Sequence, residues 1–107
     1  AWDGAALIIA YAPCIAHGID MRDVQEIEKK AVQCGYFPLY RYHPANGLML
    51  DSKAPDGDFQ AFLMRQGRFA ALRRSDPAKS ETLCKMAEEA ARRRWNLLKM
   101  LKNREMP

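Results

Sequence analysis

The sequence predicts an α/β fold, with a small, mostly parallel sheet, flanking helices and a long helix at the C-terminal end. The apolar run Ala6–Ala12 is typical of a strand buried on both faces, because it does not alternate with polar residues. A helical stripe follows it, and the aromatic-rich stretch FPLYRYHP follows the helix. This strand–helix–strand order favours two parallel neighbours joined by a right-handed crossover.

The first helix is expected to begin after Asp23, with Glu26 three residues later as in a capping box. Gly35 is expected to end the helix as a left-handed cap. The apolar positions of one helical stripe are Val24, Ile27, Ala31 and Cys34. This stripe predicts the face that packs on the core.

The remaining elements follow from turn and cap residues. FPLYRYHP is predicted to be a strand that ends at Pro44, the turn PANG follows, and LMLDSK is a third short extended piece. Asp58 can cap a short helix that Gly67 ends, and Asp76-Pro77 opens the last and longest helix. The predicted core stripe of that helix is Leu83, Ala87, Ala90, Leu97 and Leu101.

Length and cysteine usage limit the class of protein. The 107 residues make one domain at most, and no apolar run approaches the roughly 20 residues that a membrane span needs. The three cysteines are widely spaced and include no Cys-x-x-Cys pair, which favours a reducing, cytoplasmic setting over a disulfide framework. The thin sheet, and an opening AWDG that leads from no element, predict that residues 1–107 are a single partial domain of a larger protein.

Charge is distributed unevenly along the chain. Residues 1–53 hold five Lys/Arg against six Asp/Glu, a balance of −1, whereas residues 54–107 hold twelve against seven, a balance of +5. Such an excess can attract nucleic acid, an anionic membrane or an acidic protein. Acids interleaved on the last helix, such as Glu88 and Glu89, favour a solvated helix face instead.

Cys14 is the residue whose position most suggests chemistry. It follows the predicted buried strand at once, and sites in open α/β sheets gather beyond the carboxyl ends of strands. A thiol there can fill the core, act as a nucleophile or redox partner, or ligate a metal. The residues alone favour a small buried side chain. Cys34 lies on the apolar stripe of its predicted helix and Cys84 lies beside Leu83 in the last helix, and both are interpreted as structural.

Three phrases in order carry a resemblance to a known family. LIIAYAPCIAHGI, KKAVQCGYFPLYRYHP and LDSKAPDGDFQAFLMRQGRFAAL resemble the C-terminal segment of the pyruvate:ferredoxin (or flavodoxin) oxidoreductases. The resemblance runs from about Ala5 to Leu72, and only the short loop DMRD departs from the family pattern. These enzymes are multidomain, so the resemblance implies that the chain is part of a Rossmann-like domain that binds thiamine pyrophosphate.

The resemblance also implies a function. The parent enzyme would convert pyruvate to acetyl-CoA and CO2 with coenzyme A, and would pass electrons through iron–sulfur clusters to ferredoxin or flavodoxin. Cys14 would supply one of the four thiolates of a 4Fe–4S cluster, and His17 would either hydrogen-bond near the cluster or pack the loop. Thiamine pyrophosphate and Mg²⁺ would be bound by other segments, so no catalytic or cofactor-binding residue is assigned in this chain.

Partners follow from the same resemblance. The remainder of the parent enzyme, itself expected to be a homo-oligomer, would be the main partner, with neither nucleic acid nor a membrane bound. The isolated chain is expected to be inactive and to hold no cofactor. Two alternatives stay open at this point: an oxidoreductase acting on another 2-oxoacid, and a free-standing basic module that binds an acidic partner or nucleic acid.

Overall fold

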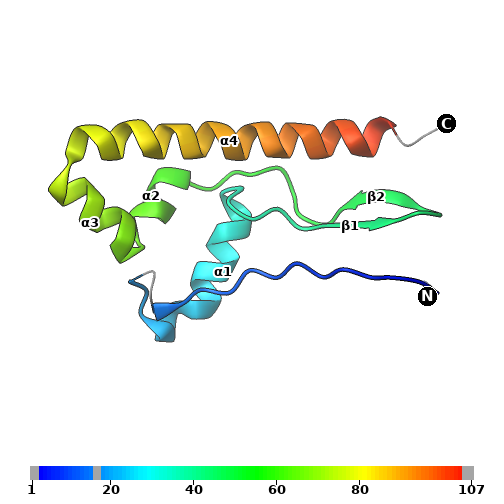
Figure 1. Cartoon of the computed structure of the whole chain (residues 1–107), viewed down its shortest axis with the longest axis horizontal. Coiled ribbons are helices and arrows are strands. Elements are labelled where there is room, and N and C mark those ends of the chain that lie inside the picture. The colour runs from blue at the N-terminus through cyan, green and yellow to red at the C-terminus, as the bar shows by residue number, and fades with distance from the viewer. Residues whose placement is uncertain (1–2, 16–17, 105–107) are drawn as a thin grey trace.

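A computed structural model of the protein describes residues 3–15 and 18–104. A long helix runs along one side of the molecule, and an extended N-terminal segment runs along the opposite side (Figure 1). Three shorter helices lie between them at one end, and a β-hairpin lies at the other. The elements are the short 3-10 helix η2 (Met21–Asp23), α1 (Val24–Gln33), β1 (Tyr40–His43), β2 (Gly47–Leu50), α2 (Phe59–Met64), α3 (Gly67–Ser75) and α4 (Pro77–Arg104).

The predicted parallel sheet is wrong. Among the described residues the sheet has two strands, β1 and β2, and they pair antiparallel with Tyr40 opposite Leu50 and His43 opposite Gly47. The turn PANG forms as predicted, and its last residue, Gly47, has a φ of +80°. A three-residue connection can join only antiparallel strands, so the two neighbouring extended pieces pair with each other.

The predicted strand at residues 6–12 is also not formed, although the segment is extended (Figure 1). The side chains of Leu7, Ile8 and Ile9 are 84%, 89% and 66% exposed instead of buried. A strand that is buried on both faces needs a neighbouring strand and a layer packed on each side. The described part of the chain supplies neither, so the segment stays outside the sheet.

The helix boundaries largely agree with the sequence, with differences at two caps. Asp58 caps α2 by accepting a hydrogen bond of 3.0 Å from the N–H of Ala61, and Gly35 has the expected left-handed conformation after α1. Asp23 makes no side-chain cap on α1. The short helix η2 precedes α1 directly, and Asp20 caps η2 by accepting a hydrogen bond from the N–H of Arg22. Gly67 does not end α2 but begins the separate helix α3.

The core lies where α1, α2 and α4 meet, and its fully buried centre is Ile27 and Leu63. Cys34 and Cys84 are buried in this core, in agreement with the structural role expected of both. The described helices are each too short or too polar to cross a bilayer.

The predicted core stripe of α4 is wrong at its three leucines, by about one residue, whereas Ala87 packs against the core as predicted. Leu83, Leu97 and Leu101 are exposed, and the side chains that face the core are mostly small: Ser80, Cys84, Ala91 and Leu98. Small side chains let the long helix approach α2 and α3 closely. The helix therefore carries two apolar stripes, and the one with the larger residues faces outward.

Candidate metal-ligand site

Cys14 is exposed and lies directly before a turn, between two buried residues. Pro13, immediately before it, is buried, and Ile19, five residues after it, belongs to the core. The turn closes when the N–H of Gly18 donates a hydrogen bond of 2.9 Å to the carbonyl of Ile15. The thiol is therefore held at the surface by a segment that is fixed on both sides, and it is not the buried filler that the residues alone favoured.

A second backbone hydrogen bond fastens this turn to α3. The N–H of Gly67, the first residue of α3, donates to the carbonyl of Gly18 at 3.2 Å. The first N–H groups of a helix have no partner within the helix, so this bond satisfies one of them. His17, predicted to lie near a cluster or to pack the loop, lies outside the described residues.

Tyr11 anchors the extended segment on the other side of Cys14. Its ring centroid lies 5.9 Å from that of Tyr36 and 5.6 Å from that of Phe37. Its hydroxyl is buried and has no hydrogen-bond partner among the described residues. Burial, with a smaller effect of the neighbouring Tyr36, raises the pKa of Tyr11, so the hydroxyl stays protonated.

The other two thiols lie in the core and cannot join Cys14. The Cys34 thiol donates a weak hydrogen bond of 3.7 Å to the carbonyl of Ala31, and burial raises its pKa. The Cys84 sulfur lies 3.9 Å from the hydroxyl of Ser80. Burial of this kind is typical of inert structural cysteines rather than of nucleophiles or metal ligands.

The described residues contain no group of three or more His, Cys, Asp or Glu side chains that are placed to hold a metal ion. A 4Fe–4S cluster takes four cysteine thiolates. Cys14 fits one of these four positions, because it is exposed and its backbone is anchored. The described residues therefore fit the role of one ligand and do not form a complete cluster site.

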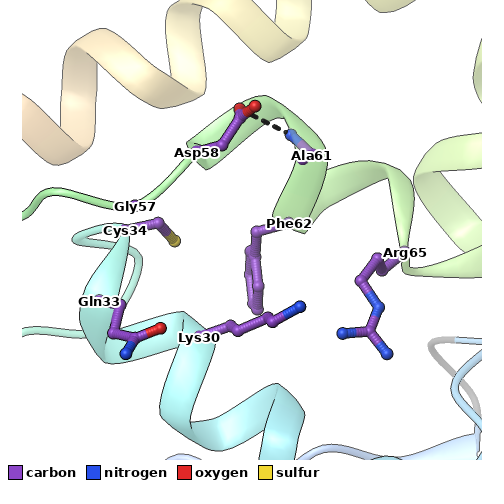
Figure 2. Close-up of a pocket in the computed structure, with 8 residues that line it drawn as sticks. All are labelled: Lys30, Gln33, Cys34, Gly57, Asp58, Ala61, Phe62 and Arg65. Atoms are coloured by element: carbon purple, nitrogen blue, oxygen red, sulfur yellow. Dashed lines mark hydrogen bonds between the residues drawn. The ribbon is translucent and has the colours of Figure 1, made fainter.

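A small cavity of about 150 Å³ lies between α1 and α2, and Cys34, Phe62, Lys30 and Arg65 are among its lining residues. Figure 2 shows the Cys34 sulfur facing the cavity and the Lys30 side chain extending toward Arg65. Both cations already bind the Glu26 carboxylate, at 3.1 Å and 3.3 Å. Since their charge is shared with Glu26, the cavity offers no evident site for an anionic ligand.

The sequence of the chain is similar to parts of several known proteins. No protein-family model matches the chain. The pyruvate:ferredoxin oxidoreductase of Moorella thermoacetica is 46% identical over 106 residues, which cover 94% of this chain and 9% of that protein. The pyruvate-flavodoxin oxidoreductase of Klebsiella pneumoniae is 42% identical over 113 residues, which cover 98% of this chain and 10% of that protein. The chain is therefore similar to one segment of the pyruvate:ferredoxin and pyruvate-flavodoxin oxidoreductases.

The predicted resemblance to these oxidoreductases is therefore confirmed, and it extends along nearly the whole chain. The chain spans about a tenth of the length of these curated relatives. A further relative, named pyruvate dehydrogenase [NADP(+)], mitochondrial, comes from Euglena gracilis. It is 38% identical over 104 residues, which cover 89% of this chain and 6% of that protein.

The sequence predicts Cys14 as a candidate ligand, and it gave no indication of the residues that hold its segment. Gly67 was interpreted only as a helix stop, and Gly18 and Tyr11 were given no role. Tyr11 interrupts an apolar run with a hydroxyl, and Gly18 follows the cysteine within one turn. Those two features were the available signals, but nothing local in the sequence connects Gly18 to Gly67.

Proposed function

We propose that this chain works as part of an oxidoreductase that decarboxylates pyruvate oxidatively, forms acetyl-CoA and CO2, and passes electrons to ferredoxin or flavodoxin. Within that enzyme, Cys14 supplies one thiolate of a 4Fe–4S cluster. The observation that carries the proposal is the 46% identity to a pyruvate:ferredoxin oxidoreductase along a segment that contains Cys14. The exposed, anchored position of the thiol supports the ligand role.

Cys14 is the residue that this chain contributes to the proposed cluster. When bound, a 4Fe–4S cluster accepts and releases one electron at a time at a potential set by its surroundings. The thiolate of Cys14 would hold one iron of that cluster, and the buried Pro13 and Ile19 on either side limit how far the thiolate can move. Thiamine pyrophosphate and Mg²⁺ belong, in this proposal, to other segments of the parent enzyme.

Exposed apolar side chains support a place within a larger protein. Leu7, Ile8 and Ile9 are exposed on the extended segment, and the outward stripe of α4 consists of Leu83, Met86, Leu97, Met100 and Leu101. Contiguous apolar patches of this kind usually mark an interface. We propose that the remainder of the parent enzyme packs on these exposed apolar side chains. Residues 1–107 would then form part of the domain that binds thiamine pyrophosphate.

The names of the relatives favour pyruvate over another 2-oxoacid. Pyruvate stands in each of the three names quoted above, whereas the acceptors differ and are ferredoxin, flavodoxin and NADP⁺. A segment that is shared by enzymes with different electron acceptors is better suited to the oxidation of pyruvate, which these enzymes have in common, than to docking one particular acceptor. No contact in the described part of the chain favours the alternative of a free-standing basic module.

Compartment and assembly complete the proposal. The three cysteines all lie among the described residues and none forms a disulfide, which suits a reducing compartment such as the cytoplasm. The Euglena relative carries the word mitochondrial in its name. We keep the cytoplasm and a homo-oligomeric parent as parts of the proposal.

The test compares three cysteine variants in the full-length enzyme. We expect Cys14→Ala to lose one 4Fe–4S cluster, seen as a fall in iron and acid-labile sulfide and as the loss of one electron paramagnetic resonance signal. Cys34→Ala and Cys84→Ala are the controls, because both thiols are buried in the core, and their iron content should match the wild type. Full iron and an unchanged spectrum in Cys14→Ala would remove the ligand assignment.

A further inference from the structure

Gly18 and Gly67 bring the Cys14 turn into direct backbone contact with α3. Gly67 donates its N–H to the carbonyl of Gly18 at 3.2 Å, and Gly18 donates its own N–H to the carbonyl of Ile15 at 2.9 Å. Ile15 is covalently bonded to Cys14. Two successive hydrogen bonds therefore connect the backbone beside the thiol to the first residue of a helix that is distant in the sequence.

Only glycine fits on the Gly18 side of this contact. Gly18 has a φ of +72°, a conformation that side chains other than that of glycine rarely adopt. A Cβ placed there would lie 2.6 Å from the Cα of Gly67 and 2.8 Å from its nitrogen. Any side chain at Gly18 would therefore both strain the backbone and displace α3.

The fit on the Gly67 side is tight but less severe. A Cβ added to Gly67 would lie 3.1 Å from the Cα of Gly18 and 3.2 Å from its carbonyl oxygen. At these distances the neighbour must move by a few tenths of an ångström. The neighbour here is the backbone of the Cys14 turn, so a single methyl group at Gly67 would push that turn.

The α3 side of the contact is itself firmly held. Gln66, the N-cap of α3, is 3% exposed, so the residue directly before the helix is in the interior. On the other side, Ile19 packs in the core directly after Gly18. The backbone beside Cys14 is therefore held between the buried residues Ile19 and Gln66. Its position relative to α3 depends on how closely Gly18 and Gly67 approach each other.

We propose that the Gly18–Gly67 contact is a positioning device that sets where the Cys14 thiolate meets the cluster. This inference rests on the proposed role of Cys14 as a ligand. A metal-binding constellation works only when its ligands are held to within about half an ångström of the productive geometry. Gly67 is a positioning residue in this sense, because it acts on the ligand through the backbone of Gly18.

The experiment uses the full-length enzyme with Gly67→Ala, and Gly57→Ala is the matched control. A Cβ at Gly57 would also meet backbone atoms at 3.1 Å, but those atoms belong to Gln33 and Cys34 at the opposite end of α1. The signal followed is the electron paramagnetic resonance spectrum that Cys14→Ala removes. Its reduction potential and the rate at which a chelator takes up iron are measured in both glycine variants.

We expect Gly67→Ala to shift the spectrum and potential of that cluster and to speed iron release about tenfold or more, the size of effect typical when a group that orients a metal ligand is disturbed. Gly57→Ala should resemble the wild type. If Gly67→Ala does not fold, Ile19→Val loosens the same turn by one methyl group without adding an atom, and faster iron release is again expected.

Three outcomes would count against the proposal in different ways. Wild-type spectrum and iron release in Gly67→Ala, or in Ile19→Val where that variant replaces it, would overturn the positioning role and leave Cys14 as a ligand. Equal changes in Gly67→Ala and Gly57→Ala would also overturn it, because the effect would then be a general loosening of the fold. An unchanged spectrum in Cys14→Ala would overturn the proposed function itself.

Discussion

The guanidinium of Arg94 donates a hydrogen bond of 3.0 Å to the backbone carbonyl of Tyr36. Arg94 lies on α4, and Tyr36 lies in the loop between α1 and β1, so this bond joins the long helix to the aromatic cluster around Tyr11. The neighbouring Arg92 binds Glu88 on α4 at 3.3 Å. Two of the three consecutive arginines thus have partners within the chain, which favours a structural role over docking of an acidic carrier.

Arg94→Ala should therefore loosen the loop after α1. A hydrogen bond from a charged but exposed donor contributes about 1 kcal/mol, which corresponds to roughly a fivefold change in a local opening equilibrium. We expect amide hydrogen exchange at residues 36–39 of the full-length enzyme to speed up by about that factor. Arg93→Ala, an exposed neighbour on the same helix, is the control. Wild-type exchange in the Arg94 variant would show that the bond does not stabilise the loop.

The local elements could be predicted because their signals are local. Asp58, Gly35 and Pro77 each act through their own turn of backbone, and the structure places them at the predicted helix ends. The pairing of strands could not be predicted in the same way. The apolar run at residues 6–12 has the composition of an inner strand, but whether it pairs depends on segments that the described residues do not include.

The α4 stripe and the Cys14 site show a second limit. Helical periodicity finds apolar stripes, but it does not say which of two stripes faces the core. Here the core selects the small residues Cys84 and Ala91, and Leu97 faces outward. At the site, the sequence predicts Cys14 as a candidate ligand, whereas the contact between Gly18 and Gly67 beside it is tertiary. Such a contact leaves no pattern at either position alone.

Acid should weaken the contact between α1 and α2 through Glu26. Lys30 and Arg65 bind its carboxylate, and Lys30 first and then Arg65 hold the pKa of Glu26 below its usual 4.5. Because the folded pKa is depressed, the stabilisation is present above pH 4.5 and is lost as the pH falls through the lower folded value. We expect the protection factors of the α1 amides, which correct for the intrinsic pH dependence of exchange, to fall in that acid range for the wild type.

The matched pair for this prediction is Glu26→Gln and Glu28→Gln on the same helix. Glu26→Gln should exchange faster than the wild type near neutral pH and should lose the extra acid dependence, because its amide does not titrate. Glu28→Gln should keep the wild-type profile. An acid profile of Glu26→Gln that matches the wild type would mean that another carboxylate controls this contact.

Tyr11 should act through its ring and not through its hydroxyl. The ring packs on Tyr36 and Phe37, whereas the buried hydroxyl has no hydrogen-bond partner among the described residues. We expect Tyr11→Phe to leave hydrogen exchange at residues 11–15 unchanged or slightly slower, since an unsatisfied buried hydroxyl carries a desolvation cost. Tyr11→Ala should speed exchange there, because it removes the aromatic contacts. Equal acceleration in both variants would indicate that the hydroxyl binds a group elsewhere in the parent enzyme.

Ile8 tests whether the extended segment is covered in the parent enzyme. Its side chain is 89% exposed in this structure, and surface substitutions away from special features usually change stability by no more than about 0.5 kcal/mol. If the parent enzyme buries the segment, Ile8→Glu loses the burial of an isoleucine and places a charge in an apolar setting, at a cost of about 2 kcal/mol or more. We expect a lowered thermal midpoint of the full-length enzyme. Gln25→Glu adds the same side chain at an exposed position of α1 and should keep the wild-type midpoint. If both variants melt with the wild type, residues 6–12 are exposed in the parent as they are here, and the assigned cover is wrong.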